Sequence, residues 1–182
     1  MRTSRLDLRR PVEADIDAVW RIHTDPLACA HNPGDAISTR DEAVERWQSW
    51  DAHWERNGFG YFTVRLLPHD EPLGFCGIKR MELHGKPVLN LFYRFDPAVW
   101  GGGIATEAAT AVVRWAEEQR PGETLIARVR PENAASIKVA EKAGLRRAPE
   151  LDAAGEDGLD WIFVNEAALP PAGGSARNNP YA

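Results

Sequence analysis

Cysteine is scarce in this chain, which has only Cys29 and Cys76 among its 182 residues, far apart and without a CxxC spacing. The pair makes neither a disulfide framework nor a plausible zinc site, so we predict no bound metal. Basic residues are not in excess either, because 22 Lys and Arg stand against 27 Asp and Glu, giving a net charge of −5. Proteins that bind nucleic acid usually carry a basic face, and we therefore expect no nucleic-acid partner.

Long apolar runs are missing as well. No segment approaches the roughly 18 apolar residues that a membrane span needs, and the first residues lack the apolar stretch of a signal peptide. The composition is otherwise that of an ordinary globular protein, with 43% hydrophobic and 27% charged residues. We predict a cytoplasmic protein without a membrane partner, folded as a single domain over residues 1–169. Residues 170–182, rich in Pro, Gly, Ala, Ser and Asn, are predicted to form a flexible tail.

The periodicity of the apolar residues predicts an α+β fold. Alternation and short apolar runs indicate strands, whereas apolar residues three and four positions apart indicate amphipathic helices. Short turns join the second, third and fourth strands, so an antiparallel meander is the simplest pairing. We expect a mixed, mainly antiparallel sheet of six to seven strands flanked by helices. The strands are expected at 5–9, 59–67, 73–83, 87–95, 124–129 and 160–164, and helices at 12–22, 105–116 and 133–142.

A further, longer helix is predicted between an N-cap signal at Ser38-Thr39 and the stop signal Asn57-Gly58. Trp47, Trp50 and Trp54 are spaced three and four residues apart, so their rings fall on one face of this helix. An aromatic cage for a cation is one interpretation of the stripe. We prefer the interpretation that the helix buries the stripe against a sheet.

The most distinctive stretch is Trp100-Gly101-Gly102-Gly103-Ile104-Ala105-Thr106, a glycine run between a strand and a helix. The first N–H groups of a helix lack internal partners and lie at the positive end of its dipole, and glycines let a phosphate approach the backbone. This order therefore favours an anion-binding site, with an ordinary glycine-rich connection as the alternative. The dinucleotide fingerprint fails because Thr106 stands where the third Gly belongs, and no Gly-Lys-Ser/Thr follows to make a P-loop.

A second polar segment, Asn133-x-x-Ser136 with Glu-Lys-x-Gly downstream, again lies between a strand and a helix. Together the two segments resemble the GNAT acetyltransferase superfamily. Its cofactor motif Q/R-x-x-G-x-G/A matches Gly103 and Ala105, with Trp100 in place of the usual Gln or Arg. The Trp-Gly-x-Gly-x-Ala-Thr-Glu-Ala form is similar to the branch that contains ribosomal-protein alanine N-acetyltransferases. The resemblance covers roughly residues 5–165.

This resemblance implies a GNAT-like fold and an acyl-CoA-dependent N-acetyltransferase that uses acetyl-CoA as cosubstrate. A primary amine, on a peptide N-terminus or a small molecule, would attack the thioester directly, without an enzyme nucleophile. The resemblance leaves a homodimer open. The cofactor-binding residues that it implies are Phe95, Trp100, Gly101, Gly102, Gly103, Ile104, Ala105, Thr106, Asn133 and Ser136.

Two positions depart from the pattern of the family. The branch often has Glu on the strand before the glycine run, where this chain has Asn90, and many GNAT enzymes have Tyr at the position of Ala140. An alternative function is therefore a non-catalytic acyl-CoA-binding sensor or scaffold, which kept the cofactor loop and lost its base. Amine-dependent release of thiol would distinguish the two.

The remaining candidates for proton transfer are few. Ser136 is the candidate acid for the departing thiolate, and its alternative role is to satisfy the amides at the helix N-terminus. Glu82 is a candidate base, acting directly or through water, and His31 and His84 are further candidates. Each of these three could instead be an exposed loop residue.

Overall fold

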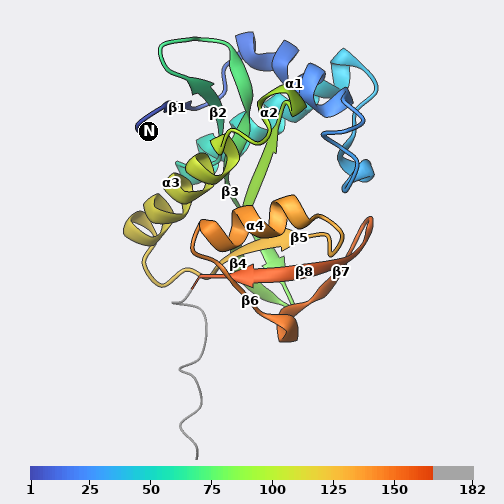
Figure 1. Cartoon of the computed structure of the whole chain (residues 1–182), viewed down its shortest axis with the longest axis vertical. Helices are drawn as coiled ribbons and strands as arrows, with labels where there is room; N and C mark the ends of the chain where they lie inside the picture. Colours follow the sequence, from blue (N-terminus) through green and yellow to red (C-terminus); the bar gives the residue numbers. More distant parts are fainter. Residues whose placement is uncertain (166–182) are drawn as a thin grey trace, which may run out of the picture.

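The computed structural model describes residues 1–165, which form one eight-stranded sheet with helices on both faces (Figure 1). The sheet order is β1-β2-β3-β4-β5-β8-β6, with β7 paired to β8. β4 and β5 run parallel, and the other strand pairs are antiparallel. The strands are β1 (Leu6–Arg9), β2 (Tyr61–Leu66), β3 (Pro72–Leu83), β4 (Lys86–Phe95), β5 (Leu125–Val129), β6 (Arg146–Arg147), β7 (Ala153–Gly155) and β8 (Gly158–Val164).

The α+β class and the antiparallel meander of β2, β3 and β4 are confirmed. The predicted count of six to seven strands is too low. The strands that sequence reading missed are β6 and β7, which have two and three residues and are too short to show a periodic pattern. The predicted tail, residues 170–182, lies outside the described residues.

Four α-helices are α1 (Ile16–Thr24), α2 (Arg40–Asn57), α3 (Ile104–Gln119) and α4 (Ala134–Lys142). Helix α1 begins at Ile16 and not at residue 12 as predicted, because a 3-10 turn at Glu13–Asp15 precedes it. That turn buries Asp15, whose carboxylate pairs with Arg65 and accepts a hydrogen bond from Thr63 at 2.8 Å. Asp15 and Arg65 are 50 positions apart in the sequence, so local sequence rules cannot detect their ion pair. No helix within residues 1–165 is both long and apolar enough to cross a membrane.

Helix α2 follows the sequence rules closely. Thr39 and Glu42 form a capping box at its start, and Gly58 ends it with a φ of 71°. The tryptophan stripe packs against the sheet as expected: Trp50 contacts Phe75 at a centroid distance of 5.0 Å, and the Trp54 indole donates to the Tyr61 carbonyl at 2.8 Å. The three tryptophans are partly buried and pack against the hydrophobic core.

The two faces of the sheet carry different helices. Because side chains alternate along a strand, neighbouring residues on β3 and β4 point to opposite faces. Cys76 and Leu91 join the core under α3 and α4, whereas Phe75 and Phe92 pack against α1 and α2. Figure 1 shows α1 and α2 gathered near β2 and β3, and α4 lying over β5 and β8. β4 lies in the middle of the sheet, and both groups of elements can contribute to a site along it.

Candidate active site

A cavity of about 640 Å³ opens where β4 and β5 separate. The two strands pair only from Leu89 to Leu91 on the β4 side, although β4 continues to Phe95 and β5 continues to Val129. Beyond Leu91, the backbone of β4 therefore has no strand partner on the side that faces β5. A cavity of this size falls within the range of roughly 300–1,000 Å³ that is usual for small-molecule sites.

One end of the cavity is formed by the N-terminus of α3. Gly103 is the N-cap with a φ of 76°, and Gly101 has a φ of 79°, a backbone conformation that other residues rarely adopt. The first hydrogen bond into the helix is donated by Glu107 to the Gly103 carbonyl at 3.0 Å. The N–H groups of residues 104–106 precede that bond and have no partner within the helix, so this end can bind an anion.

The amino-terminal segment holds the glycine run in place, which sequence reading missed. The Arg5 guanidinium donates to the Glu107 carboxylate at 2.7 Å and to the Gly102 carbonyl at 3.1 Å. Burial alone would raise the pKa of Glu107, but hydrogen bonds from Thr3 and Arg5 lower that pKa below its usual value. Glu107 therefore stays ionised and acts as an anchor of the loop.

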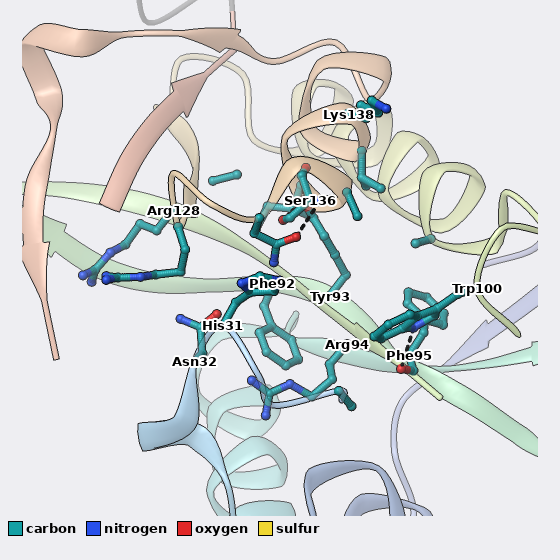
Figure 2. Close-up of a pocket in the computed structure, with 18 of the residues that line it drawn as sticks. His31, Asn32, Phe92, Tyr93, Arg94, Phe95, Trp100, Arg128, Ser136 and Lys138 are labelled. Carbon is teal, nitrogen blue, oxygen red and sulfur yellow. Dashed lines mark hydrogen bonds between the residues drawn. The ribbon is translucent and has the colours of Figure 1, made fainter. Parts of the chain in front are cut away.

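Most of the predicted cofactor-binding residues line this cavity. Gly102 does not, and its carbonyl accepts a hydrogen bond from Arg5. The residues from the predicted set that do line it are Phe95, Trp100, Gly101, Gly103, Ile104, Ala105, Thr106, Asn133 and Ser136. Trp100 is 55% exposed, and its indole donates to the Phe95 carbonyl at 3.1 Å, as Figure 2 shows.

The predicted base candidates do not meet at the cavity. Glu82 is exposed on β3 and does not line the cavity, so its role as a base stays a prediction that the geometry of the cavity does not support. Glu82 pairs with Pro87 near the β3–β4 turn, away from the separation of β4 and β5. His84 lies in that turn and its ring contacts the Leu151 carbonyl at 3.1 Å. Of the three candidates, only His31 lines the cavity.

The first turn of α4 forms another wall. The N-cap is Asn133, whose side-chain oxygen accepts the Ser136 N–H at 2.9 Å. The predicted alternative role of Ser136 as the cap is therefore wrong, because Asn133 satisfies the amide and leaves the Ser136 hydroxyl for another partner. That partner is Tyr93 of β4, whose phenol oxygen lies 2.7 Å from Ser136 Oγ.

Tyr93 is the site residue that sequence reading overlooked. Figure 2 shows its side chain reaching from β4 to Ser136 on α4. Burial raises the pKa of Tyr93, so the phenol keeps its proton at neutral pH. The alternation of β4 could have indicated it, since Tyr93 points to the same face as Phe95, two residues further on.

The opposite end of the cavity is formed by the loop between α1 and α2 and by the turn between β7 and β8. Arg94 is buried and donates to Asp35 Oδ2 at 3.2 Å and to Cys29 Sγ at 3.3 Å, which ties the loop to β4. The Gly34 N–H donates to Asp157 Oδ1 at 3.0 Å and joins the two loops directly. His31 and Asn32 lie at this end beside Arg128 in Figure 2.

Two arginines at this end share one carboxylate. Arg128 binds Asp160 Oδ2 through two nitrogens at 2.6 and 2.9 Å, and Arg130 binds the other oxygen of Asp160 at 3.3 Å. Arg130 also donates to the Asp157 carbonyl, which holds the β7–β8 turn in place. Asp35, Glu156 and Asp157 add carboxylates to the lining.

The acidic, histidine and cysteine side chains of residues 1–165 are dispersed, and the two cysteines are buried. No group of three or more His, Cys, Asp or Glu that could hold a metal ion occurs there. Both cysteines are free and buried, and burial raises the pKa of the Cys29 and Cys76 thiols. A raised pKa keeps a thiol protonated and makes it a poor nucleophile.

Comparison with known proteins agrees with this geometry. The model of the acetyltransferase (GNAT) domain family matches residues 5–146. The uncharacterised protein YkkB of Bacillus subtilis is 31% identical over 150 residues, covering 79% of this chain and 83% of its own. An acetyltransferase from Agrobacterium tumefaciens superposes with a TM-score of 0.76 at 28% identity, covering 90% of this chain and 92% of its own.

A more distant structure shares the fold. The ribosomal L7/L12 alpha-N-protein acetyltransferase RimL, solved in complex with coenzyme A, has a TM-score of 0.72 at 16% identity, covering 90% of this chain and 94% of its own. The family match spans well over half of the chain and includes the glycine run and the first turn of α4. The chain belongs to the GNAT acetyltransferase family.

Proposed function

We propose that this protein is an N-acetyltransferase that transfers the acetyl group of acetyl-CoA to a primary amine by direct attack. The observation that carries the proposal is that the gap between β4 and β5 and the unpartnered amides of α3 open into one cavity. A long ligand with a phosphate end and an amide-containing arm fits that combination. RimL, which shares the fold, was solved with coenzyme A.

The pyrophosphate of acetyl-CoA would be bound by the amides of residues 101–106. A Cβ added at Gly101 would meet nothing within 4 Å, and one at Gly103 would meet only the Arg5 guanidinium, at 3.5 Å. The space beside these glycines is therefore open to a ligand. Lys138 and Lys142 of α4 line the same cavity and add positive charge.

The arm of acetyl-CoA would lie along β4 after Leu91, where the backbone has no partner from β5. Its amide groups can complete the hydrogen bonds that the missing strand leaves open. A backbone N–H on this stretch of β4 would also stabilise the oxyanion that forms when the amine attacks the thioester carbonyl. The sheet therefore serves both binding and chemistry.

The acceptor amine would enter between the α1–α2 loop and the β7–β8 turn. A primary amine with a pKa of about 10 is mostly protonated at neutral pH and must lose a proton before it attacks. We assign that proton to His31, the predicted base candidate that lines the cavity. Asp35, Glu156 and Asp157 favour a cationic acceptor, such as a peptide N-terminus or a small-molecule amine.

The proposal is tested by thiol release from acetyl-CoA with a panel of small primary amines and N-terminal peptides. We expect amine-dependent release with at least one class of acceptor, and its rate should fall in His31→Gln while the calorimetric affinity for acetyl-CoA stays unchanged. Binding of acetyl-CoA without release for any acceptor would instead support the sensor or scaffold alternative. Absence of binding would contradict both.

A further inference from the structure

The phenol of Tyr93 and the hydroxyl of Ser136 meet at the wall between β4 and α4. We infer that Tyr93 is a positioning residue that acts through Ser136 and sets the direction in which the Ser136 hydroxyl donates its proton. The inference rests on the proposed acetyl transfer, in which the departing thiolate must be protonated. The inference assigns a role to Tyr93 of β4 in addition to Ser136, the candidate acid on α4.

The hydrogen bonds around Tyr93 allow two arrangements. The phenol oxygen lies 2.7 Å from Ser136 Oγ and 2.9 Å from the Ser136 carbonyl oxygen, but it has a single proton to donate. When the phenol donates to the carbonyl, the Ser136 hydroxyl donates to the phenol oxygen, and its proton is turned away from a ligand. When the phenol donates to Ser136 Oγ, the Ser136 proton is free to point into the cavity.

The two arrangements differ only in the positions of two protons. No heavy atom has to move between them, because the Ser136 carbonyl oxygen and Oγ both lie within hydrogen-bond distance of the phenol oxygen. Asn133 fixes that residue from the other side by accepting its N–H at 2.9 Å. Ser136 is therefore held by the cap of α4 and by β4, which leaves proton direction as its main freedom.

Helix α4 carries no tyrosine at the position where many GNAT enzymes have one. This chain has Ala140 there, which has no hydroxyl and is fully buried in the core under α3 and α4. Tyr93 supplies one from the facing wall, on a central strand that is paired with β3 along its length. A hydroxyl on a paired strand is well fixed, which reduces the reorganisation needed during the reaction.

The reaction step balances without a change in Tyr93. The C–N bond forms and the C–S bond breaks, and the sulfur takes the proton of Ser136 Oγ. The hydrogen bond that Tyr93 donates to Ser136 Oγ stabilises the negative charge that grows on that oxygen. His31 takes the proton that the ammonium loses before attack, and the second proton, which the nitrogen loses after the C–N bond forms, restores Ser136 through water. Tyr93 keeps its own proton throughout.

The test compares Tyr93→Phe, Ser136→Ala and the double variant in the thiol-release assay. Tyr93→Phe keeps the ring and removes the hydroxyl, so we expect kcat to fall roughly tenfold while KM and the calorimetric Kd for acetyl-CoA change less than about twofold. Ser136→Ala should lower kcat at least as much, and the double variant should be no slower than Ser136→Ala. Tyr61→Phe, at a second buried tyrosine that does not contact Ser136, is the matched control and should leave kcat unchanged.

The outcomes separate the inference from the function on which it rests. Wild-type kcat in folded Tyr93→Phe, or losses that multiply in the double variant, would overturn the role of Tyr93 and leave the acetyltransferase intact. A fall in kcat that is matched by a fall in melting temperature and in acetyl-CoA affinity would show a merely structural role and overturn it as well. No thiol release from the wild type would overturn the proposed function and this inference together.

Discussion

The two ends of the cavity offer different kinds of groups to a ligand. At the end formed by α3, the groups available to a ligand are backbone amides at a helix N-terminus, arranged by glycines with positive φ. At the end formed by the α1–α2 loop and the β7–β8 turn, they are side chains held by ion pairs and single hydrogen bonds, such as Arg94 with Asp35 and Gly34 with Asp157. The first end can bind a feature that all CoA thioesters share, whereas the second can distinguish one acceptor from another.

This difference also predicts how each end responds to change. Backbone amides do not titrate, and they are lost only when the chain conformation changes. The loop end depends on charges and on a few contacts between segments far apart in the sequence, so acid and single side-chain substitutions should affect it first. Two predictions use this contrast.

The largest expected effect is acid destabilisation through His23, which lies beneath the α1–α2 loop. Its carbonyl accepts hydrogen bonds from Ile37 N–H at 3.0 Å and from the Cys29 thiol at 3.3 Å, so His23 anchors the loop. Burial, together with the charges of Arg94 and Arg46, lowers the pKa of His23 to about 3. The ring is therefore neutral in the folded protein at any pH above that value.

The difference in proton binding between the folded and the unfolded chain determines how the free energy of unfolding changes with pH. An unfolded His titrates near 6.5, so between about pH 6.5 and 3 the unfolded chain binds more protons at this site, and the free energy of unfolding falls as the pH falls. The shift corresponds to a loss on the order of 5 kcal/mol at the acid end. Urea unfolding at several pH values should show a shallower slope in His23→Phe than in the wild type, whereas His69→Asn, at an exposed turn, should keep the wild-type slope. Equal slopes in His23→Phe and the wild type would contradict the prediction.

A smaller effect is expected at the contact between the two loops. Asp157→Ala removes the acceptor of the Gly34 N–H, a single hydrogen bond worth about 0.5–1.5 kcal/mol. We expect KM for the acceptor to rise roughly threefold, with KM for acetyl-CoA unchanged, because only the acceptor end loses a contact. Steady-state kinetics with each substrate varied in turn measures the effect.

Asp157→Asn separates the hydrogen bond from the charge. It retains a side-chain oxygen for the Gly34 N–H and removes the negative charge, so its KM for the acceptor should rise less than that of Asp157→Ala. If Asn and Ala raise that KM equally, the carboxylate acts by attracting the amine, and the contact between the loops is incidental.

The sequence predicts the α3 end far better than the acceptor end, for a physical reason. Caps, turns and glycine runs are local, and the rules that govern them need only neighbouring residues, as Thr39 with Glu42 in α2 shows. The glycine run can therefore be proposed as an anion site from the sequence alone. The ion pair between Asp15 and Arg65 and the anchoring of Gly102 by Arg5 depend on contacts across the fold.

The proposed catalytic residues illustrate the same limit. Only the register of β3 and β4 shows that Glu82, the predicted base, lies near the exposed turn and away from the cavity. Tyr93 and Ser136 are 43 positions apart and meet only because α4 packs over the separated strands. Motif spacing identified Ser136 on the helix, but nothing local connects it to the strand.

The amides at the start of α3 are proposed to bind the pyrophosphate of acetyl-CoA, and calorimetric titration of Gly103→Val is the sharpest test of that binding. Gly103 has a φ of 76°, and a β-branched side chain there strains the backbone and crowds the phosphate. Gly85→Val is the matched control, since Gly85 has a φ of 74° in the β3–β4 turn, does not line the cavity, and imposes a similar strain.

We predict that Gly103→Val weakens acetyl-CoA binding at least tenfold, or about 1.4 kcal/mol, while its circular dichroism spectrum is preserved and Gly85→Val binds like the wild type. Wild-type affinity in a folded Gly103→Val, or an equal loss in both variants, would show that the phosphates bind elsewhere and would contradict the account.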